Sequence, residues 1–282
     1  MKAIQTLNPS NNSYYNNKVV IITGGSAGIG KEIARQVLEQ GGKVVLTGRN
    51  AERLRSLLTE FSAHSANILL HQGDTADMTG NEEMVAKTII CFGRIDVLIN
   101  NAGLSCFGEV EKMNTETARQ IIDTNIYGSL YPVIASLPEL KKTKGAILFI
   151  SSVAGLHGLP GYSAYSLSKM SLKGLAQSLK AELQNEVFVG ISYVGFTENE
   201  FNKKTMNEKG EWVNVPKRPK LLTFTRQKTV SKLLDQIRNR KHSQIQSLLG
   251  NFTGIISRFF PNALGSILSL NYRNSQPKYS QA

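Results

Sequence analysis

Cysteine and tryptophan are scarce in this sequence, which has two cysteines and one tryptophan among its 282 residues. Cys91 and Cys106 form neither a disulfide framework nor a metal-binding spacing, so we expect a reducing compartment and no metal site. Residues 1–17 lack the basic start and apolar run of a signal peptide, and their polar composition predicts a flexible N-terminal arm. Arg258 and Pro261 interrupt the last apolar region, so we expect no membrane span. These absences favour a cytoplasmic protein, with peripheral membrane association left open.

Acidic residues are scarce in the last third of the chain. Residues 1–200 contain 18 Lys and Arg against 18 Asp and Glu, whereas residues 201–282 contain 15 against 3 and so hold the whole net charge of +12. This asymmetry indicates contact with an anionic membrane surface, an acidic protein or a nucleic acid, although a solvated basic face explains it equally well. A nucleic-acid partner is disfavoured, because the basic segment contains no recognisable binding module.

Short β-branched runs alternate with helix-like stretches from residue 18 to about residue 195. The expected strands are KVVIIT (18–23), KVVLTG (43–48), ANILLHQ (66–72), IDVLIN (95–100), GAILFIS (145–151) and VFVGISYV (187–194). Several of them are continuously apolar, which is typical of strands covered by helices on both faces. The pattern predicts an α/β fold with a Rossmann-like, doubly wound parallel sheet flanked by helices. The chain has no internal repeats and no linker-like stretch, which favours a single domain.

The alternation of strand-like and helix-like stretches stops beyond residue 195. Residues 197–222 are polar and basic and contain Trp212, and they are expected to form a segment that covers the substrate. A helix is expected over 227–240 and a short last strand over 244–249. We therefore expect a dinucleotide-binding and catalytic domain over 18–250, and the remaining residues 251–282 are expected to form a basic, amphipathic C-terminal extension.

The C-terminal extension contains an apolar stripe at helical spacing, formed by Phe252, Ile255, Ile256, Phe259 and Phe260. Pro261 is expected to start a further turn or helix, because proline is favoured at the first helical position. A stripe of this kind is typical of a helix docked on its own domain or on a second subunit. A helix that lies on a membrane surface has the same pattern, so this alternative stays open.

A glycine-rich loop, TGGSAGIG (23–30), stands between the first expected strand and the first helix. Its glycines follow a Gly-x-x-x-Gly-x-Gly spacing, which differs from the Gly-x-Gly-x-x-Gly of many dinucleotide sites. Both patterns give a tight turn without Cβ atoms, close approach to a pyrophosphate and a helix N-terminus that faces it. The expected cofactor-binding residues here are Thr23, Gly24, Ser26, Gly28, Ile29 and Gly30.

The end of the second expected strand indicates which dinucleotide is bound. An NAD site usually has an acidic residue there for the ribose hydroxyls, but this chain has Gly48 followed by Arg49. A guanidinium can pair bidentately with a 2′-phosphate. The sequence therefore favours NADP(H) over NAD(H), with Arg49 as the reader of the phosphate. Arg53 and Arg55 are nearby competitors, and Arg49 as an ordinary surface arginine is the alternative.

The stretch GYSAYSLSK (161–169) places Tyr165 four residues before Lys169, which puts both on one face of a helix. Such a pair is often structural, because both side chains bury their apolar parts while their polar ends reach water. A nearby cation also stabilises a phenolate and lowers the tyrosine pKa from about 10, which makes the phenol a usable acid or base near neutral pH. The pair alone does not decide between these interpretations.

Four motifs in one order resemble those of the short-chain dehydrogenase/reductase family over about residues 18–195. They are TGGSAGIG, NNAG (100–103), the Ser-Ser pair at 151–152 and YSLSK (165–169). The resemblance implies that Tyr165 donates the proton to a substrate carbonyl and that Lys169 binds the nicotinamide ribose and depresses the tyrosine pKa. It also implies a homodimer or homotetramer, because members of the family commonly form these assemblies.

The same resemblance assigns further residues. The family serine lies thirteen residues before the tyrosine, which selects Ser152 over Ser151 as the group that hydrogen-bonds the carbonyl oxygen. Asn125 matches the asparagine that supports a water-linked proton relay to the lysine. Tyr162 is expected to be a pocket wall. On the adenine side the matching residues are Asp74, Asn101 and Gly103.

The sequence departs from the family after the sixth strand. The usual Pro-Gly is replaced by Val194 and Gly195, and Asn199 stands at the position of the usual threonine. Thr197, two residues earlier, is therefore the expected contact of the nicotinamide carboxamide.

The leading prediction is an NADPH-dependent reductase, reversible as an alcohol dehydrogenase, that acts on a hydrophobic ketone. RNRKH and FFPNALGSILSLNYR in the C-terminal region are similar to family branches that handle lipid-like or steroid-like ketones. One alternative is a 3-oxoacyl thioester reductase whose basic surface receives an acidic carrier or coenzyme A. Another is a non-catalytic NADPH-binding regulator, which a complete catalytic set disfavours.

Overall fold

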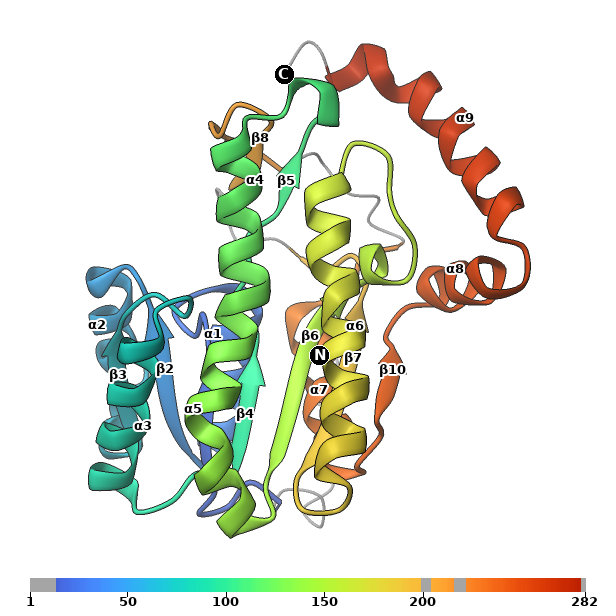
Figure 1. Ribbon diagram of the computed structural model, residues 1–282. Helices are drawn as coiled ribbons and strands as arrows, with labels where there is room; N and C mark the ends of the chain where they lie inside the picture. The colour runs from blue at the N-terminus through green and yellow to red at the C-terminus, as the bar shows by residue number, and fades with distance from the viewer. Residues whose placement is uncertain (1–13, 199–203, 216–221, 280–282) are drawn as a thin grey trace, which may run out of the picture.

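Seven parallel strands form the central sheet of the computed structural model, which describes residues 14–198, 204–215 and 222–279 (Figure 1). In spatial order they are β3 (Ile68–Gln72), β2 (Lys43–Gly48), β1 (Val19–Ile22), β4 (Val97–Asn100), β6 (Ala146–Ser152), β7 (Phe188–Val194) and β10 (Ser243–Ile245). The order reverses between β1 and β4, as in a doubly wound nucleotide-binding sheet. This confirms the predicted Rossmann-like fold and places the carboxyl ends of β1, β4 and β6 at the crossover.

Helices cover both faces of this sheet (Figure 1). One layer contains α1 (Gly28–Glu39), α2 (Ala51–Glu60) and α7 (Arg226–Arg238), and the other α3 (Met78–Phe92), α5 (Gly128–Thr143) and α6 (Ser163–Leu183). Successive side chains of a strand point to opposite faces, so Val20 and Ile22 pack with the first layer and Val19 and Ile21 with the second. The continuously apolar strands are explained by these two cores.

Smaller elements lie beyond the carboxyl edge of the sheet. A second sheet has the order β5-β8-β9, with β5 (Cys106–Phe107), β8 (Lys204–Asn207) and β9 (Trp212–Asn214). The helix α4 (Thr115–Ile122) continues through a π-helical turn, Asp123–Tyr127, into α5. Among the described residues, 3₁₀ turns follow β5 at Val110–Lys112 and β6 at Val153–Gly155, and another at Ser62–Asn67 precedes β3 at the opposite edge of the sheet. The expected substrate segment therefore contributes the β8–β9 hairpin, which pairs with the chain that follows β4.

The N-terminal arm is shorter than predicted. Tyr15 is 1% exposed, and its hydroxyl donates a hydrogen bond of 3.0 Å to the carbonyl oxygen of Leu234 in α7. Burial raises the pKa of Tyr15 well above its ordinary value. The prediction of a flexible arm over 1–17 is therefore wrong for residues 14–17, which an aromatic anchor fixes to the core, while residues 1–13 lie outside the described part of the chain.

The predicted last strand and domain boundary also shift. The strand expected over 244–249 ends at Ile245, because Ser247 caps a new helix by accepting a hydrogen bond of 3.0 Å from the Gly250 amide. That helix, α8, runs from Leu248 to Phe259, so the boundary expected after residue 250 falls inside it.

The C-terminal extension consists of α8 and α9 (Pro261–Tyr279), and Figure 1 shows α9 as an arch that stands apart from the helices on the sheet. Most of the predicted apolar stripe faces outward: Phe252, Ile255, Phe259 and Phe260 are each about 59–65% exposed. Docking of the whole stripe on its own domain is therefore wrong, because α8 packs through Gly250 and Thr253 instead. No helix in the described residues is long and apolar enough to cross a bilayer.

Candidate active site

The glycine loop turns tightly between β1 and α1. Gly24 and Gly28 have φ angles of +62° and +56°, which side chains rarely tolerate. A methyl group built on Gly30 would clash with the Gly24 carbonyl oxygen, so only glycine allows the helix to approach the loop this closely. Asn101 fixes the turn, since its Nδ2 donates to the carbonyl oxygens of Thr23 at 2.9 Å and Gly24 at 3.1 Å.

Thr23 also joins the end of β1 to the end of β4 by hydrogen bonds. Its Oγ1 accepts hydrogen bonds from the Asn101 and Ala102 amides at 2.9 and 3.0 Å. Thr23 and Asn101 thus fix the position of the glycine loop, residues 23–30, which we call the cradle. The glycines allow the tight turn of this loop. The predicted residues of the loop and of the β4 end are brought together as the sequence implied.

The cradle fits a dinucleotide phosphate. In the described structure no side chain caps the N-terminus of α1, and its first turn contains no acidic residue, so the positive end of the helix dipole meets no negative charge from its own turn. Ile29 packs against the core and anchors this end of the helix. A methyl group on Gly48 would lie 3.1 Å from Ser26 Oγ, so the glycine loop packs closely against the end of β2.

Arg49 and Asp74 lie together at the ends of β2 and β3. Arg49 Nη1 is 3.8 Å from Asp74 Oδ2, and both side chains are nearly half exposed. Asp74 is held by its own turn, because its Oδ1 accepts a hydrogen bond of 2.9 Å from the Ala76 amide. Arg49 and Asp74, which come from separate sequence motifs, thus lie within ion-pair distance at the ends of neighbouring strands.

Lys169 is buried beneath the carboxyl end of β6. Its side chain is 6% exposed, and Nζ donates a hydrogen bond of 3.2 Å to the Ile150 carbonyl oxygen. Nζ lies 6.0 Å from the centre of the Tyr165 ring, one helical turn earlier on α6. Burial lowers the pKa of Lys169 from 10.5 to about 8, because the charged form loses its hydration.

Two polar atoms converge above Gly103. A methyl group built on this glycine would lie 3.1 Å from Lys169 Nζ and 3.2 Å from Asn125 Oδ1. Glycine thus lets an amine nitrogen and an amide oxygen lie close to the backbone at this point, and a side chain here would displace at least one of them.

Asn125 lies in the π-helical turn between α4 and α5 and is completely buried. Its amide makes three hydrogen bonds: Nδ2 donates to the Leu104 carbonyl oxygen at 2.9 Å and to Ser168 Oγ at 2.8 Å, and Oδ1 accepts from the Leu104 amide at 2.7 Å. The side chain thus joins the segment after β4 to α6. A π-turn is common at functional sites, and here it places this residue against the neighbouring helix.

Two serines without an expected role make hydrogen bonds that hold α6. Ser168 Oγ donates to the Tyr165 carbonyl oxygen at 2.8 Å and accepts from Asn125. Ser151 Oγ donates to the Lys169 carbonyl oxygen at 2.9 Å. The spacing to the tyrosine selected Ser152 over Ser151, and it could not reveal the tertiary contact between Ser151 and α6.

Ser152 ends β6 and remains the candidate for contact with a substrate oxygen. It is less buried than Ser151, and its Oγ accepts only a long hydrogen bond of 3.3 Å from the Ala154 amide. The adjacent Tyr162 ring packs edge-on against Phe107, with centroids 5.0 Å apart, and lies 6.4 Å from the Tyr165 ring. The role of Tyr162 as a pocket wall stays a prediction.

Thr197 is 5% exposed, and its Oγ1 lies 3.4 Å from the Gly195 carbonyl oxygen and 3.3 Å from Thr229 Oγ1 of α7. Its hydroxyl is thus directed at neighbouring protein groups, so a contact with a carboxamide stays a prediction. Asn199 lies outside the described residues.

Comparison with known proteins gives one family. The family model described as short chain dehydrogenase matches residues 18–210. The 11-beta-hydroxysteroid dehydrogenase-like 4A of Arabidopsis thaliana is 35% identical over 205 residues, which are 71% of this chain and 68% of the relative. The 3-ketodihydrosphingosine reductase of Bos taurus is 36% identical over 181 residues, which cover 62% of this chain but only 54% of that protein.

Solved structures share the fold. An alcohol dehydrogenase from Thermococcus sibiricus, complexed with 5-hydroxy-NADP, has a TM-score of 0.71 at 24% identity, covering 82% of this chain and 97% of its own. A short chain dehydrogenase/reductase from Burkholderia phymatum, in complex with NAD, has a TM-score of 0.75 at 19% identity, covering 86% and 94%. At these identities the likeness shows the fold alone.

Proposed function

This chain belongs to the short-chain dehydrogenase/reductase family, and we propose that it is an NADPH-dependent reductase of a hydrophobic, lipid-like or steroid-like ketone that also runs in reverse as an alcohol dehydrogenase. Its oxidoreductase class follows from the family. One observation supports catalysis best: Lys169 Nζ and Asn125 Oδ1 lie together beside Gly103. Lys169 also follows Tyr165 by one turn of α6.

Each side chain of the site has a proposed role in the reaction. A nicotinamide dinucleotide in the glycine cradle supplies the hydride in reduction and accepts it in oxidation. The Tyr165 hydroxyl gives its proton to the carbonyl oxygen, and Ser152 Oγ donates a hydrogen bond to the same oxygen. Lys169 hydrogen-bonds the ribose, and its positive charge favours release of the tyrosine proton. Asn125 supports the relay that returns a proton towards Lys169, while Ser168 and Ser151 hold α6 in place.

The preference for NADP(H) is supported by Arg49. Its guanidinium is held at the adenosine end of the cradle by Asp74, and Gly48 leaves no acid at the end of β2. A 2′-phosphate would compete for the same guanidinium through charge-assisted hydrogen bonds. Asp74, Asn101 and Gly103 then border the adenosine and ribose, and Thr197 is the proposed contact of the carboxamide.

A hydrophobic substrate is supported by the two relatives, one named for hydroxysteroid dehydrogenation and one for 3-ketodihydrosphingosine reduction. The test measures NADPH oxidation against a small methyl ketone, a steroid ketone, a long-chain 3-ketone and a 3-oxoacyl thioester. Turnover of the hydrophobic ketones supports the proposal. Turnover confined to 3-oxoacyl thioesters would establish the alternative that the basic C-terminal segment favours, and NADPH binding without any turnover would establish a regulator.

The proposed partners, a membrane surface and further copies of this chain, are inferred from charge and from exposed apolar side chains. The outward apolar stripe of α8 and the net charge of +12 on residues 201–282 support reversible association with an anionic membrane from the cytoplasmic side. Exposed Tyr127 and Ile134 near and on α5, at 42% and 48%, support a homodimer or homotetramer. The proposed organisation remains a catalytic domain followed by a basic extension.

A further inference from the structure

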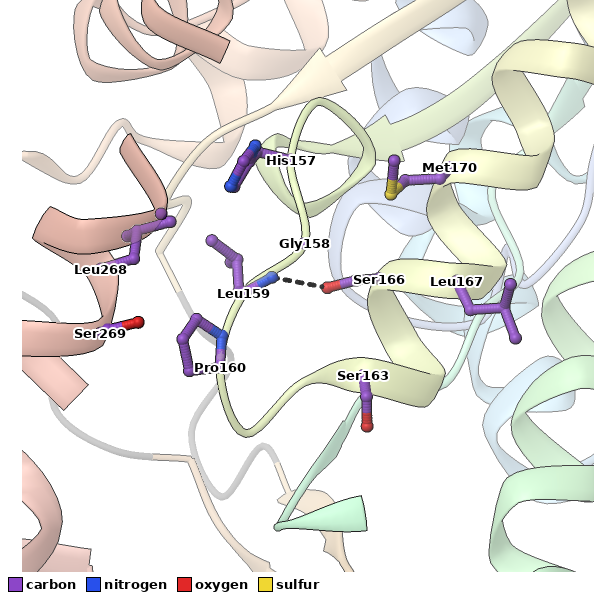
Figure 2. A pocket seen from close by; sticks show the side chains of 11 residues that line it. His157, Gly158, Leu159, Pro160, Ser163, Ser166, Leu167, Met170, Leu268 and Ser269 are labelled. Carbon is purple, nitrogen blue, oxygen red and sulfur yellow. Dashed lines mark hydrogen bonds between the residues drawn. The ribbon is translucent and has the colours of Figure 1, made fainter. Parts of the chain in front are cut away.

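An apolar groove of about 520 Å³ lies between the arch formed by α9 and the start of α6 (Figure 2), and its lining residues do not include the glycine loop. Figure 2 shows Leu268 and Ser269 of α9 on one side, with Leu159 and Pro160 of the loop before α6 facing them. The volume falls within the range of about 300–1,000 Å³ that is typical of small-molecule sites. None of the described residues that line the groove is Asp, Glu, Lys or Arg.

Protein contacts already occupy two of the polar groups in the groove wall. His157 Nδ1 lies 3.2 Å from Ser257 Oγ of α8, and Ser166 Oγ accepts a hydrogen bond of 3.2 Å from the Leu159 amide. The groove therefore offers mainly hydrocarbon surface to an occupant. A hydrocarbon chain gains about 0.8 kcal/mol for each CH₂ group buried there, whereas a nucleotide or a charged peptide would lose hydration without gaining a charged partner.

Tyr272 ties α9 to the chain near the catalytic helix. Its hydroxyl donates a hydrogen bond of 3.0 Å to Glu109 Oε1. A methyl group built on Gly161 would lie 3.2 Å from the Tyr272 ring and 2.8 Å from the Phe107 ring, so both rings pack on this glycine. Gly161 has a φ of +75°, a second reason for glycine at this point.

The same contacts connect the groove to the catalytic tyrosine. Tyr272 follows Leu268 by one helical turn, so it stands at the end of the groove wall. From Gly161 the aromatic surface continues through Phe107 and Tyr162 to Tyr165, with centroid distances of 5.0 and 6.4 Å. These ring contacts connect the end of α9 to the segment that contains Tyr165.

The route around α6 favours a bendable occupant. At about 100° per residue, Ser163, Ser166 and Met170 lie about 100–200° around the α6 axis from Tyr165. A ligand that reaches both the tyrosine and the groove must therefore curve around the loop before α6. A linear alkyl chain can follow this path, whereas a rigid fused-ring ketone cannot.

We propose that the groove between α6 and α9 binds the alkyl chain of a long-chain ketone whose carbonyl lies at Tyr165, and that Gly265 and Leu268 of α9 select for chain length. This inference rests on the proposed function and narrows its substrate class to linear-chain ketones. It assigns chain recognition to the C-terminal arch rather than to the segment 197–222.

Gly265 provides the test variant. A methyl group built there meets no atom within 4 Å, so Gly265→Trp fills the groove without a backbone clash and removes a glycine from a helix. Ala263→Trp is the matched control, because Ala263 is exposed on the same helix and does not line the groove. Ser269→Trp, also in the groove wall, is the second variant if Gly265→Trp fails to fold.

The primary measurement is binding of a radiolabelled hexadecyl methyl ketone to the full chain by equilibrium dialysis, with butanone as the short competitor. We expect Gly265→Trp to lose at least about tenfold in affinity, which corresponds to about 1.4 kcal/mol, and Ala263→Trp to remain within about twofold. Unchanged affinity in the groove variants, or no binding to the wild-type chain, would overturn the inference. A changed oligomeric state with unchanged ketone binding would overturn it too, by identifying the groove as a contact between subunits.

Ketone turnover separates this inference from the proposed function. In an NADPH oxidation assay, Gly265→Trp is expected to lower kcat/KM for the long-chain ketone at least about tenfold and to leave the value for a short ketone unchanged. If the wild-type chain binds the long-chain ketone and Gly265→Trp does not, but no ketone is turned over, the groove assignment stands and the reductase proposal fails.

Discussion

Tyr165 is the residue whose hydroxyl has a proposed role only in the chemical step. We therefore expect Tyr165→Phe to lower turnover at least about a hundredfold, the usual range for loss of a general acid, while NADPH affinity stays within a few-fold. Steady-state NADPH oxidation and cofactor titration measure the two effects separately. Tyr131→Phe, which removes a phenol hydroxyl on α5, is the control. A Tyr165→Phe enzyme at the wild-type rate would contradict the catalytic assignment.

Lys169 gives a pH prediction because its pKa is lowered from 10.5 to about 8 by burial. Below pH 8 the group is charged in both states, and the folded state bears the cost of burying the charge. Between about pH 8 and 10.5 the unfolded chain binds more protons, so stability rises with pH in this window. We expect the free energy of unfolding of the wild type to increase relative to Lys169→Met by up to about 3 kcal/mol across it.

Denaturant unfolding of the two proteins at several pH values measures this difference, in which groups common to both cancel. A constant difference from pH 7 to 11 would show that Lys169 is not buried as a charged group. Lys169→Met is also expected to weaken both turnover and NADPH binding, since the side chain is assigned to the ribose as well as to the tyrosine.

Arg49 is tested by reversing its charge. We expect Arg49→Glu to weaken NADPH binding by about 1.5–3 kcal/mol and NADH binding much less, because only NADPH has the 2′-phosphate. Isothermal titration with each cofactor gives the ratio. Arg53→Glu and Arg55→Glu are matched controls on α2, and equal losses of both cofactors in Arg49→Glu, or a changed ratio in a control instead, would show that Arg49 does not read the phosphate.

At the scale of elements, most of the sheet could be predicted because buried parallel strands are continuous apolar runs. The structure keeps the predicted strand over 43–48 without change and the helix expected over 227–240 as Arg226–Arg238. The β8–β9 hairpin could not be predicted, since its short polar strands depend on pairing with β5, about 100 residues earlier. Local pattern fails where a distant strand decides the structure.

The candidate site shows the same difference between what local sequence predicts and what distant contacts decide. Motif order assigned Ser152 to the end of a strand and Tyr165 and Lys169 to a helix that follows it, and in the structure Ser152 is the last residue of β6 while the other two lie near the start of α6. The hydrogen bonds that hold these elements could not be predicted. Ser168 meets Asn125 only because a π-turn redirects the chain between α4 and α5, and Ser151 reaches the Lys169 carbonyl only across the β6–α6 contact. Spacing identifies reactive groups, while tertiary packing decides which residues support them.

At the scale of the whole molecule, charge and exposed apolar surface lie on the same part of the chain. Residues 201–282 hold the net charge of +12, and α8 directs Phe252, Ile255, Phe259 and Phe260 into solvent. The groove proposed for the alkyl chain lies beside this extension, between α9 and α6. A long-chain ketone that leaves a bilayer at α8 would thus enter the protein without crossing water.

Membrane association is therefore expected to be electrostatic in its first step and apolar in its second. Each basic residue near an anionic surface contributes about 1 kcal/mol, and this attraction falls off over a Debye length of about 8 Å at physiological salt. We expect co-sedimentation with phosphatidylserine vesicles at low salt, little with neutral vesicles, and release as salt is raised.

Phe259→Ser combined with Phe260→Ser tests the apolar step, since both side chains are 65% exposed and their loss should leave the fold intact. We expect this variant to bind anionic vesicles at least about tenfold more weakly than the wild type, because it loses the apolar area that would enter the lipid. A wild-type protein that stays in the supernatant at low salt, together with aggregation after truncation at Asn251, would show instead that the stripe is covered by a second subunit. The exposed side chains of α8 would then be an oligomer contact, and the basic charge a solvated surface.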